Sequence, residues 1–370
     1  MRLRGLLWCA AIIVAGCSHE QPFETPATGS DRPFLPGTPV RLTYNPGADL
    51  RPAWLPDGGA FLYSWQQVGQ PDLDRCLSEL PATGGSHTRT ICNPNPAAID
   101  SADLFDTPSP SPDGRLLFIR ASSRPGAVSP NQAGVFLGTL ADPLSATQVL
   151  HLPYTIPGGR THGTISTARW ITPTRLMYVG QSVIYSRECS RCPLDTLVTG
   201  LEVVDMDLSG PQPSLAVVPA TYGASSATLS ASRDTLYYTL INDSRVFRLA
   251  LTSGQSSVAH DFGIRGIARD VTVLGARLVA VVGGEIQYTD DPVLGPIQPD
   301  GGGDLVSVDL ATGTETVLPS DQSLLFRRPE FVPGGSPIRL VAEGYQHNIG
   351  IPTRNQLVSK VGDLYLYEAP

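Results

Sequence analysis

Short stretches of apolar residues, many alternating with polar ones, recur along the chain and are separated by glycine- or proline-containing turns. "RPAWLPDGGAFLYS" (residues 51–64) sets a Pro-Asp-Gly turn between two apolar segments, and "RPEFVPGGSPIRLV" (residues 328–341) repeats this arrangement near the other end. No long segment has apolar residues at positions i, i+3, i+4 and i+7, the spacing of an amphipathic helix. The pattern therefore predicts an all-β protein built from short strands joined by tight turns.

Four further copies of the opening phrase lie between these two. They cover residues 107–120, 167–180, 226–239 and 268–283, and the first of these four also carries Pro-Asp-Gly, whose glycine suits the positive-φ position of a turn. Most copies begin about 40 to 60 residues after the previous one, a spacing typical of four-stranded propeller blades. We therefore expect six repeated units.

A second element follows most copies and reads as strand, glycine turn, strand. It covers residues 75–91, 201–218, 245–260 and 304–319. Each unit then has four strands, a to d. The last unit ends after its third strand at "GDLYLYEAP" (residues 362–370), whereas "TPVRLTYNPG" (residues 38–47) resembles a fourth strand and precedes the first unit. We expect this N-terminal strand to pair with the last blade and close a ring of six blades.

The phrase with a Trp-x-Pro-Asp-Gly turn and a following apolar strand resembles the WD-like repeats of the TolB family and of the prolyl oligopeptidase propeller. The resemblance covers residues 38–370 and implies a six-bladed β-propeller, but it says little about function. TolB has a separate N-terminal domain, whereas only a short tether precedes the propeller here, so its partner contacts are not transferred. No G-x-S-x-G is present, and this excludes the peptidase chemistry of prolyl oligopeptidases.

The N-terminal segment "MRLRGLLWCAAIIVAGC" has a basic start and an apolar run of about eleven residues, too short to span a membrane. "VAGC" resembles the lipobox of bacterial lipoproteins, which implies cleavage after residue 16 and lipid on Cys17; the alternative is an ordinary signal peptide with a chance cysteine. Ser18 after the cysteine favours the outer membrane, because aspartate there often means retention in the inner one. Residues 17–37 then form a proline-rich tether. We thus expect a periplasmic or surface-exposed envelope protein.

The net charge and the cysteine content add two expectations, one about binding partners and one about disulfides. The chain carries 26 basic and 34 acidic residues, a net charge of −8 that becomes −10 without Arg2 and Arg4, so electrostatic binding of nucleic acid or an anionic membrane is not expected. In an oxidising compartment, Cys76, Cys92, Cys189 and Cys192 are available for disulfides, and their spacing favours Cys76–Cys92 and Cys189–Cys192 over the other two pairings.

Candidate chemistry is sparse. The histidines are dispersed and never lie at i, i+4, so we predict no metal and no cofactor. The "CSRC" of residues 189–192 lacks both the helix of a redox site and the second C-x-x-C of a zinc site, which favours a structural disulfide. The acidic stretch 288–304 contains Asp290, Asp291, Asp300 and Asp304 but does not match an EF-hand, so a solvated turn is favoured.

The loops between strands b and c are long in five units, at residues 66–75, 122–132, 182–199, 288–303 and 345–361. Function on a rigid scaffold is commonly carried by such loops. We therefore expect a non-catalytic module that binds an envelope protein or polymer through this face, with Trp65, Tyr185, Tyr288 and Tyr345 as contacts, unless the loops only cap the channel. The alternative is a metal-dependent propeller enzyme of the lactonase or lyase type with its site in the central channel.

Overall fold

The structure is a computed structural model of the 370-residue chain. It describes residues 38–44, 47–66, 74–92, 102–123, 132–156, 160–186, 195–283, 289–291, 295–297, 302–320, 324–333, 338–346 and 362–368. The predicted signal peptide (1–16) and tether (17–37), together with Cys17, lie outside these ranges. No helix among the described residues is long and apolar enough to cross a membrane.

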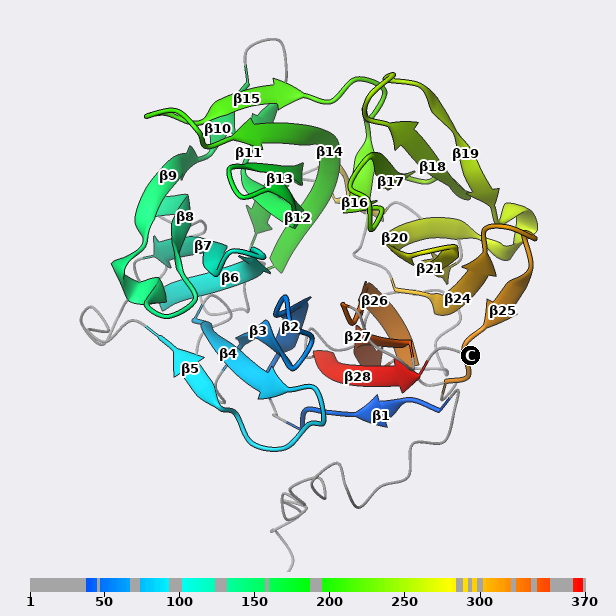
Figure 1. The fold of residues 1–370 in the computed structure, drawn as a ribbon, viewed down its shortest axis with the longest axis horizontal. Helices are drawn as coiled ribbons and strands as arrows, with labels where there is room; N and C mark the ends of the chain where they lie inside the picture. The colour runs from blue at the N-terminus through cyan, green and yellow to red at the C-terminus, as the bar shows by residue number, and fades with distance from the viewer. Residues whose placement is uncertain are drawn as a thin grey trace, which may run out of the picture.

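Six four-stranded antiparallel sheets surround a common axis as the blades of a β-propeller (Figure 1). Blade 1 consists of β2 (Asp49–Trp54), β3 (Ala60–Trp65), β4 (Cys76–Pro81) and β5 (Arg89–Ile91); blade 2 of β6 (Ala102–Pro110), β7 (Arg115–Ser123), β8 (Gln132–Thr139) and β9 (Thr147–Leu152); blade 3 of β12 (Thr164–Thr172), β13 (Arg175–Ser186), β14 (Asp195–Asp207) and β15 (Ser214–Val217). Blade 4 consists of β16 (Ala224–Leu229), β17 (Thr235–Leu240), β18 (Arg245–Ala250) and β19 (Ser256–Asp261); blade 5 of β20 (Ile267–Leu274), β21 (Arg277–Gly283), β24 (Asp304–Asp309) and β25 (Glu315–Val317); blade 6 of β26 (Leu324–Phe331), β27 (Arg339–Gln346), β28 (Gly362–Glu368) and β1 (Val40–Arg41). Two small hairpins, β10 (Tyr154–Thr155) with β11 (Thr161–His162) and β22 (Thr289–Asp291) with β23 (Gly295–Ile297), and two 3₁₀ turns, η1 (Pro143–Ser145) and η2 (Gly263–Arg265), complete the described elements.

The predicted fold class and the closure of the ring are confirmed. Strand β1 pairs antiparallel with β28, with Val40 opposite Leu366 and Arg41 opposite Tyr365. The Leu42 amide extends the pairing by donating to the Leu364 carbonyl at 2.7 Å. The N-terminal strand thus supplies the fourth strand of blade 6, so the two ends of the propeller are held in one sheet.

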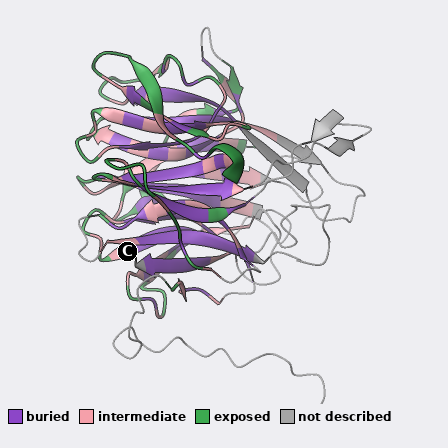
Figure 2. Cartoon of the chain, turned by 90° about the vertical axis from the view of Figure 1, so that its right-hand side faces the viewer, coloured by how far each residue is buried: buried purple, intermediate pink, exposed green. Residues whose placement is uncertain are grey.

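Burial follows the position of each strand within its blade (Figure 2). The inner strands are buried over most of their length, as in β3, whereas the outermost strand β19 is mostly exposed. Apolar residues of neighbouring blades pack together between the sheets, as where Met177 and Val179 of blade 3 meet Ala227 and Leu236 of blade 4. The core is therefore a ring of interfaces between blades.

The aromatic residue that anchors the repeated phrase packs between blades. The Trp54 indole nitrogen donates to the Glu330 carbonyl of blade 6 at 3.1 Å, and the Trp170 indole nitrogen donates to the Ser109 carbonyl of blade 2 at 3.0 Å. In each case the tryptophan reaches the innermost strand of the preceding blade. The two copies of the phrase that carry tryptophan thus make the same contact between blades.

One predicted loop is shorter than expected. Residues 182–199 were expected to form a loop, but β13 and β14 remain paired from Gln181 opposite Gly200 to Ser186 opposite Asp195. The segments are rich in Val, Ile, Tyr and Thr, whose side chains suit a pleated ribbon, so the strands continue beyond the blade. Only residues 187–194, which include Cys189 and Cys192, lie outside the described part of this segment.

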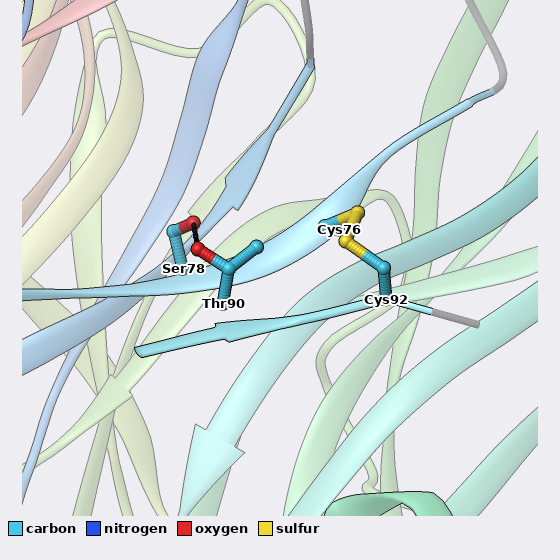
Figure 3. The surroundings of a disulfide bond; sticks show 4 residues. All are labelled: Cys76, Ser78, Thr90 and Cys92. Atoms are coloured by element: carbon cyan, nitrogen blue, oxygen red, sulfur yellow. Dashed lines mark hydrogen bonds between the residues drawn. A yellow bond between two sulfur atoms is a disulfide. The ribbon is translucent and has the colours of Figure 1, made fainter. Parts of the chain in front are cut away.

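The predicted Cys76–Cys92 disulfide is present (Figure 3). It joins the start of β4 to the residue after β5, with a Cα–Cα separation of 4.7 Å. Beside it, the hydroxyls of Ser78 and Thr90 lie 3.2 Å apart and form a hydrogen bond. The outer edge of blade 1 is thus cross-linked to its neighbouring strand.

Candidate ligand site in the central channel

The innermost strand of every blade faces the axis, and each of these strands is interrupted by a β-bulge. In blade 1 the pairing with the second strand is irregular between Leu50 and Ala53, and in blade 6 it is irregular between Arg327 and Glu330. The other four blades have a comparable irregularity. A bulge redirects side chains and increases the local twist. The six bulges therefore determine which side chains the blades direct toward the axis.

Four of the bulges contain a non-glycine residue in the left-handed region. These residues are Arg51 (φ 57°), Thr107 (φ 51°), Thr167 (φ 47°) and Arg328 (φ 46°). Such a conformation costs about 1 to 3 kcal/mol per residue, and it is least favourable for β-branched threonine. The same backbone conformation thus recurs at equivalent places in four blades, beside the axis.

Charged side chains from these bulges form ion pairs between blades. Arg51 of blade 1 contacts Asp106 of blade 2 at 3.2 Å, and Arg75 lies 3.8 Å from the same carboxylate. The hydroxyl of Ser64 also donates to Asp106 at 2.5 Å. On its other side, the backbone amide of Arg51 donates to Glu343 of blade 6. The charges of blades 1, 2 and 6 thus form one network.

The same network continues through blades 5 and 6. Arg328 binds Glu343 through both carboxylate oxygens, at 2.8 and 3.1 Å, and Tyr345 donates to Glu343 at 2.5 Å. Arg327 contacts Asp270 of blade 5 at 3.2 Å. We call Arg51, Arg75, Arg169, Arg327, Arg328, Asp106, Asp270, Glu330 and Glu343 the channel charge ring.

One ion pair crosses the channel. Arg169 of blade 3 and Glu330 of blade 6 are each the first paired residue after the bulge of their strand, so they occupy equivalent levels. Their side chains meet in an ion pair, although the two blades stand opposite each other in the ring (Figure 1). The Arg169–Glu330 pair therefore bridges the axis at this level.

Burial acts to raise the pKa of three carboxyl groups in the channel charge ring, whereas pairing with arginine acts to lower it. Burial favours the neutral form of Asp106, but the guanidinium groups of Arg51 and Arg75 hold its pKa below the ordinary value. The pKa of Asp270 is lowered in the same way by Arg327 and Arg328. Burial raises the pKa of Glu330, and Arg169 opposes this only in part. Burial thus outweighs pairing for Glu330, whereas pairing outweighs burial for Asp106 and Asp270.

A small cavity lies within the ring. It has a volume of about 40 Å³, and residues from the innermost strands of all six blades line it, which places it on the axis. Four of its lining side chains have a buried polar atom without a hydrogen-bond partner: Arg51 Nε, Arg169 Nε, Ser166 Oγ and Thr167 Oγ1. Two of these atoms are donors only, and both hydroxyls can donate. The cavity therefore offers converging donors to a ligand that accepts hydrogen bonds.

The described residues do not fit a metal ion. No group of three or more His, Cys, Asp or Glu side chains that could hold a metal occurs in the described part of the chain. The four ring carboxylates are all engaged by arginine, which competes with a cation for the same oxygens. The described carboxylates of the channel are therefore paired with arginine and do not form a metal site.

Of the four residues predicted to contact a partner, the structure describes the side chains of two, and these two have different surroundings. Trp65 is half-buried, with its ring edge-on to His87 at 5.4 Å between centroids. Tyr345 is buried and directed at Glu343 of the channel charge ring. The side chain of Tyr185 and the whole of Tyr288 lie outside the described residues. The structure thus brings Tyr345 to the channel, and partner binding by these four residues stays a prediction.

A second buried polar cluster lies at the β10–β11 hairpin. His162 is fully buried, with its Nδ1 2.9 Å from the Tyr154 hydroxyl and its Nε2 3.0 Å from Glu202. Gly180 makes room for the ring, because a Cβ there would lie 2.3 Å from imidazole atoms. Burial lowers the pKa of His162 although Glu202 acts in the opposite direction. This cluster fixes the hairpin to blade 3.

Comparisons with known proteins support the fold. No protein-family model matches the chain, and no curated protein matches its sequence. Among solved structures, the chain resembles the calcium-binding protein regucalcin from Agrobacterium tumefaciens (TM-score 0.52, 15% identity, 89% of this chain and 94% of that chain). It also resembles a gluconolactonase from Xanthomonas campestris (TM-score 0.52, 12% identity, 90% of this chain and 89% of that chain).

TolB from Acinetobacter baumannii is also similar (TM-score 0.45, 13% identity, 75% of this chain and 55% of that chain). At these identities the likenesses concern the fold alone. The protein is thus a six-bladed β-propeller with a buried, arginine-rich cavity on its axis.

Proposed function

We propose that this protein binds a small anionic molecule in its central channel. The observation that carries the proposal is the cavity, where two guanidinium Nε atoms and two hydroxyls have no hydrogen-bond partner. Leaving a buried donor unpaired costs about 1 to 3 kcal/mol, so a ligand that accepts from several of them recovers a large free energy. An anion satisfies such donors best, because charge-assisted hydrogen bonds are the stronger ones.

The charge balance of the site supports an anion. The channel charge ring holds five arginines and four carboxylates, within a chain whose net charge is −8. The cavity volume of about 40 Å³ suits roughly three water-sized groups, about the size of a carboxylate headgroup. A small organic acid is therefore the ligand class that we favour.

The hydroxyls of Ser166 and Thr167 provide the sharpest test. Replacing both (Ser166→Ala with Thr167→Val) removes two unpartnered groups, so folding stability should change little, whereas affinity for the anion should fall at least tenfold. The control is Ser109→Ala. This hydroxyl is also buried but donates to the Ala168 carbonyl at 3.0 Å, so its loss should lower stability and leave affinity unchanged.

The measurement is thermal unfolding of the full chain, purified in detergent, with acetate, gluconate, phosphate or sulfate added at matched ionic strength. We expect gluconate or acetate to raise the unfolding temperature of the wild type and of Ser109→Ala, but not of the double variant. Equal shifts in all three proteins, or none in the wild type, would contradict the proposal.

Hydrolysis of a lactone is the second candidate function, because one structure of the same fold is a gluconolactonase and the acid produced from a lactone is an anion of the favoured class. Release of acid from glucono-lactone, followed by pH indicator in the presence and absence of calcium, tests this candidate. Turnover above the spontaneous rate that the double variant loses would make the channel an active site, and a rate equal to the spontaneous one would leave binding as its role.

We also propose that lipid on Cys17 anchors the propeller in the bacterial envelope, with the outer membrane favoured by Ser18. The lipobox-like "VAGC" supports this, and Cys17→Ser should abolish incorporation of a radiolabelled fatty acid and release the protein from membrane fractions.

Binding of an envelope protein or polymer by the b–c loop face remains compatible with a channel ligand. Crosslinking in intact envelopes tests it separately.

A further inference from the structure

We infer that Arg169 is the anchor for the carboxylate of the channel ligand, and that Glu330 occupies this anchor when the ligand is absent. The inference rests on the proposed function and assigns a role to each member of the ion pair that crosses the channel. Glu330 is then a competitor built into the site, and its side chain stands in for the carboxylate of the ligand.

The position of Arg169 makes it suitable as an anchor. Its guanidinium group binds Glu330 through one terminal nitrogen and donates to the Ala168 carbonyl through the other at 3.1 Å, while its buried Nε has no partner. A guanidinium group binds a carboxylate best through two parallel N–H groups, so the present pairing uses part of its capacity. Ser166 and Thr167, on the same strand, place their unpartnered hydroxyls in the same cavity. A carboxylate entering here therefore finds donors that Glu330 leaves unused.

The surroundings of Glu330 make it easy to displace. Its ion pair with Arg169 spans two opposite blades, whereas Glu343 of the same ring is held by Arg328, Tyr345 and the Arg51 amide. Burial also raises the pKa of Glu330, which means that its charged form gains little from this position. Since two carboxylates on one buried guanidinium group repel each other, the ligand has to displace the Glu330 carboxylate from Arg169.

The channel bulges explain why the pair meets at the axis. Arg169 and Glu330 each follow a bulge that contains a residue with positive φ, Thr167 in blade 3 and Arg328 in blade 6. The extra residue shifts the register of the following position, so both side chains leave their strands at the same level. The strained backbone at Thr167 and Arg328 is thus part of the bulges that place Arg169 and Glu330 at the same level.

Titration calorimetry with gluconate and acetate tests the inference on the full chain. Glu330→Gln keeps the size of the side chain and removes its charge, so we expect it to bind the anion at least tenfold more tightly than the wild type. Arg169→Met should abolish binding, and Arg169→Lys should recover only part of it because lysine lacks the planar pair of donors. Arg175→Gln, which removes an exposed pair with Asp205, is the matched control and should bind as the wild type does.

A second variant keeps the test informative if Arg169→Met fails to fold. Glu330→Ala leaves Arg169 without its carboxylate, so acetate should raise the unfolding temperature of this variant more than that of the wild type. Anion binding by the wild type with unchanged affinity in Glu330→Gln and Arg169→Lys would overturn the inference and leave the proposed function standing. No anion binding by the wild type, Glu330→Gln or Glu330→Ala would overturn both.

Discussion

At the scale of single residues, buried polar groups in this propeller fall into two kinds. Most are satisfied, as Glu343 is by Arg328 and Tyr345. Some are not, both around the channel cavity, as with Ser166 and Thr167, and elsewhere, as with the Tyr367 hydroxyl. Natural proteins leave few buried polar atoms unpaired, so four such donors lining one cavity need an explanation. A ligand that completes the hydrogen bonding supplies it.

His162 allows a prediction about pH. Because its pKa in the folded protein lies below the ordinary value of 6.5, the unfolded chain binds a proton that the folded chain does not. The contribution of His162 to stability is therefore fully present above about pH 6.5 and is lost as the pH falls below it. His162→Gln should lower the free energy of unfolding by about 1 to 3 kcal/mol at pH 7.5, since buried hydrogen bonds are lost, and should reduce its dependence on pH.

Urea unfolding at pH 7.5, 6.5 and 5.5 measures this, with His151→Gln as the control because His151 is exposed. The control should keep both the stability and the pH dependence of the wild type. If His162→Gln retains the full pH dependence as well, His162 is not the group responsible.

At the scale of elements, the strands were predictable and the bulges were not. The alternation in residues 304–309 and the Pro-Asp-Gly turns identify strands because their physical causes are local. The bulge beside Arg51 is set by the neighbouring blades, so the pattern of residues 51–64 did not reveal that this arginine faces the channel. The signal was nonetheless present: Arg51-Pro52 and Arg328-Pro329 place a charge in an inner strand that is otherwise largely apolar.

The Cys76–Cys92 disulfide gives a prediction for blade 1. Its residues are 16 positions apart in sequence, so in the chain-entropy model the cross-link stabilises the fold by about 3 kcal/mol. The double variant Cys76→Ser with Cys92→Ser should unfold at lower urea concentration than the wild type. Added reductant should lower the midpoint of the wild type by more than that of the variant, which keeps Cys189 and Cys192. An unchanged midpoint would show that the bond contributes nothing to stability.

At the scale of the whole molecule, closure of the ring was predicted from the missing fourth strand of the last unit, and the pairing of β1 with β28 confirms it. The location of the site could not be predicted in the same way. Arg169 and Glu330 are 161 residues apart, and only the ring of six blades brings them together across the axis. Long loops suggested the b–c face, whereas the described residues place four unpartnered donor atoms beside the channel charge ring.

The structure of the protein with a bound anion tests the central claim most directly. Crystals grown with gluconate or acetate, at the lowest concentration that saturates binding in solution, should show the carboxylate in the channel cavity, within hydrogen-bond distance of Arg169, Ser166 and Thr167. Glu330 should have moved away from Arg169. An anion found only on the outer surface or over the b–c loops, with the Arg169–Glu330 pair intact, would contradict the account.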